Sequence, residues 1–346
     1  MGLPEIFISF QTAAVSAITR SARGVLAVAV KDATAGGATE AAYKSLAEVP
    51  EDKFSPENYR LLKLAFLAAP TKVWVLRVGE DAEKTYQALE RLRFDWLAAP
   101  GLDDAKVMSF IKTLRTGGRG VKAVVANATA PDCEGIVNLC VSGLTLEDGA
   151  MEAKDYAVRV AALLAALPLT RSATYVNLPE VVGCDALAEP DEAVDAGKLI
   201  IVPGREGYRL GRAVNSLTTL TPDKAAPFQK IKIVEGIDLI RGDIAKAFES
   251  GYVGKVLNDY DNKLLLVTAI NTYLKGLEGD VLDKTADNRC FVSLSGQRSY
   301  LESRGTDTSE MKDTDILKVN TGSQVFLEAK LTFCDAMEDL ALVISM

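Results

Sequence analysis

The chain has 346 residues, 48% of them hydrophobic, a formal net charge of −8 at pH 7, and no histidine. This length allows two or three packed units with a sizeable core. The lack of histidine excludes Ser-His-Asp and Cys-His catalysis and histidine metal sites, and the negative charge argues against a nucleic-acid-binding surface, which needs clustered Lys and Arg.

Cysteine usage and hydropathy indicate a cytosolic origin. The cysteines are Cys133, Cys140, Cys184, Cys290 and Cys334. Their number is odd and none form a Cys-x-x-Cys pair, so the sequence predicts buried thiols, with a reactive thiol as the alternative, and neither a zinc site nor a disulfide framework. The longest apolar runs, such as 158–167, are too short to cross a membrane, and the N-terminus does not resemble a signal peptide.

The first predicted element is an extended strand at residues 3–10. Ile6, Ile8 and Phe10 lie on it near period two, which is typical of a strand with one buried face. A stretch of polar and small residues follows. Residues 1–20 are therefore predicted to form an N-terminal arm.

From residue 24 to residue 127, predicted strands and helices alternate. Strands are predicted at 24–30, 72–78, 94–98 and 121–127, and helices at 55–68, 81–93 and 103–115. Ser55 is a suitable N-cap with Pro56 at the first helical position, and Gly117-Gly118 marks the end of the third helix. This alternation indicates an α/β layer around a mainly parallel sheet.

The α/β pattern continues to residue 210. A strand and turn are predicted at 133–149, a helix at 153–167 ended by Pro168, strands at 174–177 and 198–202, and an acidic, irregular surface excursion at 180–197. These elements complete an α/β domain at 21–210, which could consist of two subdomains with a boundary near residue 95.

After Gly211 the pattern changes to that of an α+β domain, predicted at 211–336. A strand pair is predicted near 212–220 and 230–235, helices at 238–250 and 261–277, strands at 290–295 and 325–333, and a loop at 302–315. Asn258 and Asp259 are expected to cap the second of these helices. A last apolar strand at 340–344 lies in a C-terminal arm, 337–346. The predicted fold class is thus an α/β body plus a C-terminal α+β domain, with extended strand-like arms at both termini.

Both terminal strands need a partner sheet. An unpaired strand exposes N–H and C=O groups along its whole length, so it must join other strands. The partner could be a sheet of the same domain or, by strand addition, a sheet of a neighbouring subunit. The residues themselves leave both alternatives open.

Motifs with a catalytic mechanism are absent. Gly204, Gly207 and Gly211 do not have the spacing of a dinucleotide fingerprint, and Ser293-Leu-Ser-Gly is not a nucleophile elbow. The carboxylate pairs Asp259/Asp261 and Asp313/Asp315 could bind calcium or act as an acid–base pair, but a solvated acidic face explains them better. No catalytic, cofactor-binding or metal-binding residue is predicted.

The order of segments after Gly211 resembles the C-terminal region of contractile phage tail sheath proteins. The segments are Arg-Ala-Val-Asn-Ser-Leu-Thr-Thr-Leu (212–220), Lys-Ile-Lys-Ile-Val-Glu (230–235), Asp-Leu-Ile-Arg-Gly-Asp-Ile (238–244), Tyr-Val-Gly-Lys-Val-Leu-Asn-Asp-Tyr-Asp-Asn-Lys (252–263) and Tyr-Leu-Lys-Gly-Leu (273–277). The N-terminus, Gly-Leu-Pro-Glu-Ile-Phe-Ile-Ser-Phe (2–10), and the tail 323–346 are similar to that family as well. The resemblance covers both termini and most of 200–346, and the middle of the chain more loosely.

The resemblance implies a structural subunit that assembles as stacked rings of six, helically, around a tail tube and contracts to drive the tube through a host envelope. It also implies tube, baseplate and tail terminator proteins as partners, and a place in the tail of a phage, prophage or phage-tail-like bacteriocin, made in the bacterial cytoplasm. Neither a cofactor, nor nucleic acid, nor membrane integration is implied.

Candidate subunit contacts follow from the same resemblance, because family members interlace their arms with sheets of adjacent subunits. The candidate arm residues are Ile6, Ile8, Phe10, Leu340, Leu342 and Ile344. In the C-terminal domain the candidates come from the sequence pattern alone, and for the segment 252–263 a purely structural role is the favoured interpretation; they are Lys255, Tyr260, Lys263, Val325, Leu327 and Leu331. The alternative functions are a soluble α/β enzyme that uses carboxylate or Lys chemistry, a type VI secretion sheath component, and a tail tube protein.

Overall fold

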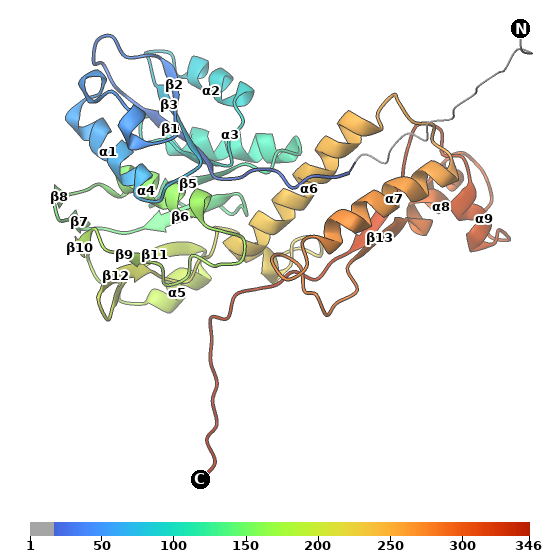
Figure 1. Ribbon diagram of the computed structural model, residues 1–346. Coiled ribbons are helices and arrows are strands. Elements are labelled where there is room, and N and C mark those ends of the chain that lie inside the picture. Colours follow the sequence, from blue (N-terminus) through green and yellow to red (C-terminus); the bar gives the residue numbers. More distant parts are fainter. Residues whose placement is uncertain (1–16) are drawn as a thin grey trace, which may run out of the picture. The chain divides into compact units, whose positions relative to one another are not determined.

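The computed structural model describes residues 17–346, and these residues form two compact units (Figure 1). The first, called here the α/β unit, comprises Ser21–Gly242 and Asp335–Met346. The second, called the C-terminal unit, comprises Asp243–Cys334 together with residues 17–20. The chain thus leaves the α/β unit after Gly242 and returns to it at Asp335. The expected N-terminal strand at 3–10 lies outside the described residues.

A nine-stranded sheet forms the centre of the α/β unit. In spatial order its strands are β2 (Glu40–Tyr43), β3 (Lys72–Arg77), β1 (Val25–Val30), β4 (Trp96–Ala98), β5 (Lys122–Ala126), β6 (Ile136–Cys140), β11 (Lys198–Gly204), β12 (Gly207–Leu210) and β9 (Asn177–Leu178). The strands from β3 to β11 pair in parallel, whereas β2, β12 and β9 are antiparallel to their neighbours. The sheet runs without interruption past residue 95, where a subdomain boundary was considered. A small second sheet has the order β10 (Val181–Gly183), β7 (Thr145–Leu146), β8 (Gly149–Ala150).

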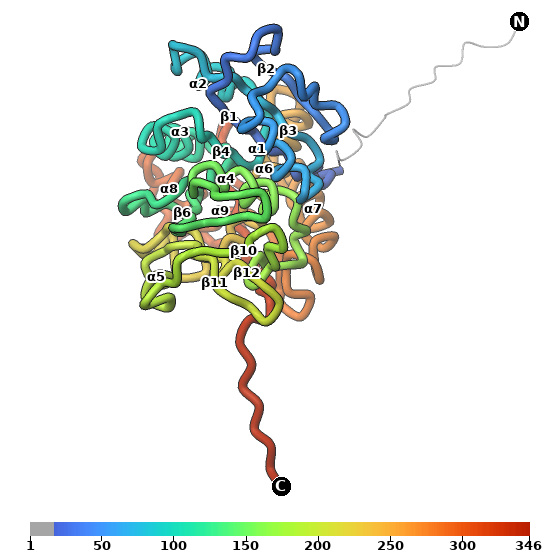
Figure 2. Tube along the Cα trace, turned by 90° about the vertical axis from the view of Figure 1, so that its left-hand side faces the viewer, coloured from blue at the N-terminus to red at the C-terminus, as the bar shows by residue number. Residues whose placement is uncertain are grey.

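Helices cover both faces of the parallel sheet. They are α1 (Pro56–Phe66), α2 (Ala82–Arg91), α3 (Asp104–Thr116), α4 (Ala153–Ala166) and α5 (Pro190–Asp195), with short 3-10 turns at Leu46–Glu48, Glu51–Lys53 and Ala226–Gln229. Helices α1 and α4 lie side by side on one face (Figure 2) and share a core with Leu26 and Val28 of β1. Helices α2 and α3 pack on the other face against Ala27 and Ala29. Because successive β1 residues point to opposite faces, one apolar strand supplies both cores.

Capping residues start the helices where the sequence predicts. Ser55 Oγ accepts a hydrogen bond from Asn58 N at 3.2 Å at the start of α1, with Pro56 at the first helical position. Asp103 caps α3 through Lys106 N. Each cap satisfies an amide that the helix leaves unpaired, which typically stabilises by about 1 kcal/mol. Within residues 17–346, no helix has the length and apolar character needed to cross a membrane.

The region 174–197 differs from its prediction. The strand expected at 174–177 begins only at Asn177, because Tyr175 has a φ of 59°, outside the extended region. The segment 180–197 is not irregular throughout, since it contains β10 and α5. Helix α5 starts at Pro190, whose fixed φ suits a first helical position and was overlooked in the acidic run.

The predicted strand pair near 212–220 and 230–235 is wrong. Only an isolated bridge joins Val214 to Lys230, and α6 spans Ile231–Gly251. The run Ile-Lys-Ile-Val has the β-branched composition of a strand, but burial of nearly every position from 231 to 240 stabilises a helix instead. Tertiary burial has overridden local propensity here.

The C-terminal unit combines helices with one small sheet. Besides the end of α6 it contains α7 (Tyr260–Lys275), α8 (Leu294–Ser303), α9 (Asp313–Lys318), β13 (Arg289–Val292) and β14 (Leu327–Lys330). Asp259 caps α7 through Asn262 N at 2.8 Å, as predicted. The expected strand at 290–295 ends early because Ser293 caps the unpredicted α8 through Gly296 N. The predicted loop 302–315 shrinks to 304–312 between α8 and α9.

The predicted strand at 340–344 has no partner strand within the described chain. No secondary structure is assigned from Asp335 to Met346, and the apolar residues from Leu340 onward are exposed. A strand exists only where its backbone pairs, so the alternating sequence alone does not produce one here.

The packing of α1 predicts a large difference between two nearby leucines. Leu62 is 0% exposed in the α1–α4 core, whereas Leu67 at the C-cap of α1 is 59% exposed. We expect Leu62→Ala to lower the free energy of unfolding by about 2–5 kcal/mol and the control Leu67→Ala to change it by less than about 0.5 kcal/mol. Both tryptophans, Trp74 and Trp96, lie in the α/β unit, so urea unfolding followed by their fluorescence reports this unit alone. Equal effects of the two changes would contradict the described packing.

Candidate assembly interface

A cluster of charged and hydroxyl groups in the α/β unit holds the start of the C-terminal segment. We call this cluster the arm anchor; its members are Ser172, Thr174, Arg212, Lys230, Asp335, Glu338 and Asp339. Glu338 Oε1 accepts hydrogen bonds from Ser172 Oγ at 2.9 Å and Thr174 Oγ1 at 2.6 Å, and its side chain is only 7% exposed. Arg212 and Lys230 reach the other carboxylate oxygen at 3.4 Å. The path of the chain is therefore fixed as far as Glu338.

Two outer carboxylates complete the arm anchor. Asp339 pairs with Arg212 at 2.6 Å, and Asp335 pairs with Lys230. Although burial lowers the pKa of Lys230, its hydrogen bond to Asp335 and the charge of Glu338 raise that pKa above its ordinary value. The pKa of Arg212 is raised as well, chiefly by its hydrogen bond to Asp339. Both cations are thus stabilised in the charged form that the anchor requires.

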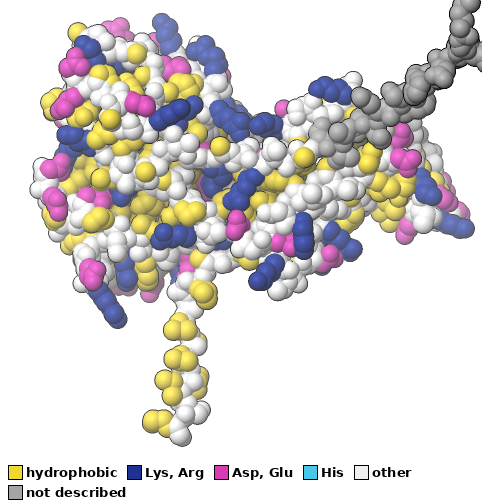
Figure 3. All heavy atoms as spheres, viewed as in Figure 1, with side chains coloured by type: hydrophobic (Ala, Val, Ile, Leu, Met, Phe, Trp, Pro, Cys, Tyr) yellow, Lys and Arg dark blue, Asp and Glu magenta, His cyan; other side chains and the backbone are white. Residues whose placement is uncertain are grey.

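Beyond the anchor the chain exposes a run of apolar side chains. From here on, the name C-terminal arm is kept for residues 340–346, the apolar part of the predicted arm 337–346; Leu340, Leu342, Val343, Ile344 and Met346 are each more than two-thirds exposed. Figure 3 shows these hydrophobic side chains along a single extended segment. Exposed apolar runs of this kind mark interaction sites in soluble proteins. The candidate contact residues Leu340, Leu342 and Ile344 all lie on this arm.

The remaining candidate contacts lie in the C-terminal unit and differ in exposure. Val325, Leu327 and Leu331 are half-buried in or beside β14, and Tyr260 is half-buried at the first position of α7. Lys255 is exposed, and its ammonium donates to the carbonyl of Ser250. The arm candidates Ile6, Ile8 and Phe10 lie outside the described residues.

The ammonium of Lys263 makes its hydrogen bonds inside the C-terminal unit. Its side chain is 2% exposed, and its Nζ donates to Gln297 Oε1 at 2.7 Å, Thr321 Oγ1 at 3.1 Å and Val319 O at 3.2 Å. Burial lowers its pKa, and these neutral acceptors replace water around the ammonium. Of its two predicted roles, the geometry favours the structural one.

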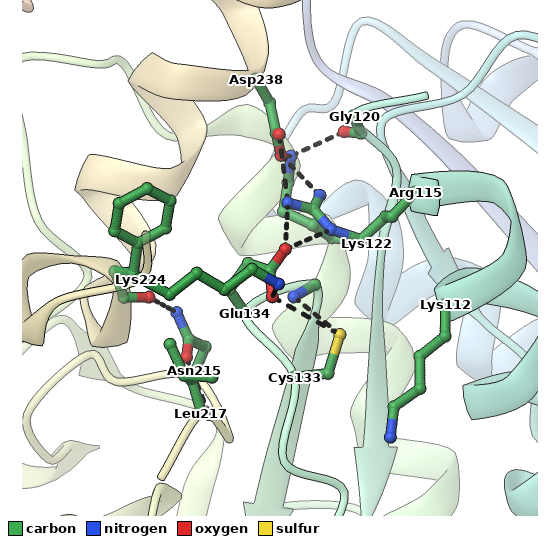
Figure 4. Close-up of polar contacts among 12 residues, drawn as sticks. Lys112, Arg115, Gly120, Lys122, Cys133, Glu134, Asn215, Leu217, Lys224 and Asp238 are labelled. Carbon is green, nitrogen blue, oxygen red and sulfur yellow. Dashed lines mark hydrogen bonds and ion pairs between the residues drawn. The ribbon is translucent and has the colours of Figure 1, made fainter. Parts of the chain in front are cut away.

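A buried ion network, which the sequence analysis missed, ties α6 to the parallel sheet. In Figure 4, Arg115 of α3 and Lys122 of β5 point toward Asp238 of α6 and Glu134. Arg115 contacts Asp238 at 2.8 Å and Glu134 at 3.1 Å, and Lys122 contacts Asp238 at 2.9 Å. Glu235, one turn before Asp238, pairs with Lys122 at 3.1 Å and with Arg23. The sequence carries one signal for this network. Glu235 and Asp238 lie within the otherwise mostly apolar run 231–240, and carboxylates that are buried with such a run need cationic partners.

The carboxylates of the network are held in their charged form, although burial lowers the pKa of Lys122 below its ordinary value. Burial raises the pKa of Asp238, but the charges of Lys122 and Arg115 outweigh burial and keep that pKa below its ordinary value. Burial likewise raises the pKa of Glu134, and its hydrogen bond to Lys224 and the charge of Arg115 lower it further than burial raises it. The network therefore stabilises the contact of α6 with the sheet as long as both acids are ionised.

A cavity of about 500 Å³ lies where β5 and β6 end. Ligands often bind at the carboxyl ends of strands in α/β sheets. Its lining includes Glu57, Arg60, Glu152 and Asp155. Arg60 is already paired with Asp148 at 2.7 Å, and burial followed by the charge of Glu152 raises the pKa of Asp155. Among residues 17–346, no group of three or more acidic or thiol side chains could hold a metal ion. The cavity by itself identifies no reaction.

Comparison with known proteins gives one consistent result. Residues 223–346 match the family described as phage tail sheath C-terminal domain. The tail sheath protein of Clostridium phage phiCD119 is 35% identical over an alignment that covers 100% of this chain and 99% of that protein. The phage-like element PBSX protein XkdK of Bacillus subtilis is 29% identical over 64% of this chain and 51% of its own length.

Solved structures share the fold at low sequence identity. The contracted helical sheath protein of the anti-feeding prophage has a TM-score of 0.74 and 14% identity, covering 100% of this chain and 99% of that one. The sheath tail protein of Desulfitobacterium hafniense has a TM-score of 0.69 and 17% identity, covering 83% and 93%. The α/β body of the predicted fold class is thereby confirmed, whereas the strand-like arms stay a prediction.

Removal of one carboxylate from the buried ion network should lower the free energy of unfolding. Asp238→Asn leaves Arg115 and Lys122 buried without their shared partner, so we expect a loss of about 3–5 kcal/mol in the free energy of unfolding. The control Asp148→Asn breaks the pair with Arg60, in which Asp148 is 60% exposed, and should cost at most about 1 kcal/mol. Urea unfolding at pH 7 measures both, and similar costs would contradict the assigned role of the network.

The same variant has a predictable pH dependence. Because the pKa of Asp238 is lowered from its ordinary value of 3.8, its contribution is fully present above about pH 4 and is lost as the pH falls through the lowered pKa. The stability difference between the unmodified chain and Asp238→Asn should therefore shrink below about pH 4. A difference that stays constant down to pH 2 would contradict this assignment.

Proposed function

We infer that this chain, which belongs to the family of phage tail sheath proteins, is a structural subunit of a contractile tail sheath and has a mechanical rather than a catalytic role. The observation that carries this conclusion is the 35% identity to a tail sheath protein along the whole of both chains. A type VI secretion sheath component is a less suitable description, because this full-length relative is a phage protein.

We propose that the subunits assemble as rings of six stacked helically around a tail tube, with baseplate and tail terminator proteins at the two ends. Related folds occur in a helical sheath in its contracted state and in a baseplate of the anti-feeding prophage. A helical array of identical subunits requires heterologous contacts, in which two different surfaces of neighbouring subunits meet without closing a ring. An arm of one subunit that binds the body of the next subunit provides such a contact. The assembled protein would then be part of a phage or phage-tail-like particle.

The C-terminal arm supplies the proposed contact by adding a strand to a neighbouring subunit. Each backbone hydrogen bond contributes roughly 0.5–1.5 kcal/mol, while ordering each arm residue costs about 1–2 kcal/mol. These two free-energy terms nearly cancel, so the burial of apolar side chains must determine whether the arm pairs. Leu340, Leu342 and Ile344 each contribute about 1.5–3 kcal/mol when fully buried, which is enough to favour pairing.

In this proposal contraction moves subunits relative to one another while the arms keep their pairing. Assembly on the tube and baseplate first holds the sheath in an extended arrangement, and release lets the subunits reach a packing of lower energy. No cofactor or nucleotide is needed, because the energy is stored at assembly.

Deletion of residues 340–346 tests the proposal. The deletion retains Glu338 and Asp339, so the arm anchor stays intact, and the removed side chains are exposed. We expect the tryptophan-detected unfolding transition to be unchanged and self-assembly to be lost. Negative-stain electron microscopy of the unmodified chain, alone and with its tail tube protein, should show hollow tubes or stacked rings, and the deleted chain should show only small particles.

A control separates the arm from general surface hydrophobicity. Leu67→Asp removes another exposed leucine, outside the arm, and should leave the tubes unchanged. Tubes formed by the deleted chain would refute the role of the arm. Small particles from the unmodified chain, even with the tube protein present, would refute the sheath function itself.

A further inference from the structure

Helix α6 is the one regular element through which the described chain passes from one unit to the other. Within residues 17–346 the chain crosses between the units after Arg20, after Gly242 and after Cys334. The first and the last of these crossings lie outside helices and strands, whereas Gly242 lies inside α6. A helix is stiff because backbone hydrogen bonds hold each of its turns. Any movement of one unit with respect to the other must therefore be accommodated within α6.

The first half of α6 is fixed to the parallel sheet by the buried ion network. Asp238 pairs with Lys122 of β5 at 2.9 Å (Figure 4), and Glu235, one turn earlier, pairs with the same ammonium at 3.1 Å. All three side chains are less than a tenth exposed and belong to the α/β unit. These ion pairs hold α6 to within four residues of Gly242.

A different contact fixes α6 directly after the glycine. Asp243 Oδ2 accepts a hydrogen bond from Tyr273 OH of α7 at 2.7 Å, and the two residues are 3% and 6% exposed. Both belong to the C-terminal unit. Burial and then this hydrogen bond raise the pKa of Tyr273, so its hydroxyl stays a donor. The helix is thus bound to the α/β unit at Asp238 and to the C-terminal unit at Asp243, with only residues 239–242 in between.

Packing does not explain the glycine at position 242. Arg241 and Gly242 are exposed, and a Cβ atom on Gly242 would have no atom of the described chain within 4 Å apart from its chain neighbours and the backbone of α6. A Cβ atom on Gly296 of α8, in contrast, would lie 3.0 Å from Phe326 Cβ, so a close approach requires that glycine. Because glycine is less favourable than alanine inside a helix and leaves helical φ and ψ values more easily, Gly242 weakens α6 without any gain in packing.

We propose that Gly242 is a hinge at which α6 bends when the subunits of the assembled sheath rearrange. Hinges consist of a few residues, often small ones, that absorb a change in φ and ψ between rigid parts. The contacts of Asp238 and Asp243 keep the two halves of α6 in place, so bending is confined to residues 239–242. The crossings after Arg20 and Cys334 have no helical hydrogen bonds to break.

This inference rests on the proposed function and adds a moving joint within each subunit. With a hinge at Gly242, one unit of a subunit can keep its contacts with neighbouring subunits while the other unit exchanges its own. Neither the ion network nor the contact between Asp243 and Tyr273 has to break in such a movement, because both lie outside the residues that bend.

Two variants test the hinge in the free subunit. Gly242→Ala removes the glycine without a steric conflict, and Gly242→Ala combined with Ala245→Gly moves it past Asp243 to another exposed position. Spin labels on unnatural amino acids at Leu67 of the α/β unit and Leu265 of α7, both exposed, report the distribution of distances between the units by double electron–electron resonance. The population of bent conformers should fall about two- to fivefold in Gly242→Ala, the ratio that corresponds to the helix preference of alanine over glycine.

The variant with the shifted glycine is the matched control. It has the same composition as the unmodified chain, but its glycine lies beyond the contact of Asp243 with Tyr273, inside the C-terminal unit. Its distance distribution should therefore be as narrow as that of Gly242→Ala. A distribution as broad as that of the unmodified chain would show that the number of glycines in α6 matters and not their place, and would overturn the hinge.

Hydrogen exchange locates the bend along α6. The amides of residues 243–246 donate to the carbonyls of residues 239–242, so their hydrogen bonds span the hinge. In the free unmodified subunit these amides should exchange at least about tenfold faster than those of residues 235–240, which lie beside the ion network. In Gly242→Ala their exchange should slow by about two- to fivefold. Equal protection along the whole of α6 would contradict bending at this point.

Assembly and contraction separate this proposal from the proposed function. Gly242→Ala should still form tubes, because the hinge serves the rearrangement and not the contacts between subunits. Sheaths of this variant assembled on tube and baseplate should contract more slowly than unmodified sheaths in electron micrographs taken after release. An unchanged contraction rate, or loss of tubes with unchanged flexibility of the free subunit, would overturn the hinge while the sheath function stands. Failure of the unmodified chain to form tubes would instead refute the sheath function.

Discussion

The pairing of backbone groups at sheet edges is the constraint that organises this molecule. Every non-proline residue carries an N–H and a C=O that must be paired or solvated, and an open edge invites another chain. In the α/β unit the parallel strands are flanked by short antiparallel strands, and the outermost one, β9, has only two residues. In the C-terminal unit Asn271 closes β13. In the proposed assembly, the C-terminal arm meets the same requirement by pairing with a neighbouring subunit.

The arm anchor gives the C-terminal arm, the proposed contact strand, a fixed origin. Glu338 accepts hydrogen bonds from two hydroxyls and faces two cations in a nearly buried position, so side-chain contacts hold the chain up to that residue. Residues 340–346 beyond it extend by at most roughly 25 Å, at 3.3–3.6 Å per residue. A strand with a fixed root and a short reach can pair only with a close neighbour. In the proposed sheath such a strand follows its neighbour when the subunits move, because only the link between Asp339 and the strand has to bend.

Local sequence signals predicted the parts of the fold that local physics decides. Ser55, Asp103 and Asp259 mark helix starts through hydrogen bonds to amides three residues away, and the apolar run at β1 identifies a strand buried on both faces. The start of α6 was mistaken for a strand because its β-branched residues are helical only through burial against distant segments. The ion network joins residues more than 100 positions apart, so no spacing in the sequence could reveal it. The arm residues were identifiable as apolar and alternating, but their lack of a partner in the same chain is visible only in three dimensions.

The energetic balance of one arm explains why such links suit an array. Backbone pairing and the ordering of the arm nearly cancel, so a single link depends on burying a few apolar side chains such as Leu342. A single link of that strength is weak. It becomes durable when each subunit is held at several points at once. The ion network contributes differently, because the loss of any one of its partners would leave another charge buried without compensation. Stable bodies joined by individually modest strand contacts can rearrange without unfolding, which is the property that a sheath storing its energy at assembly requires.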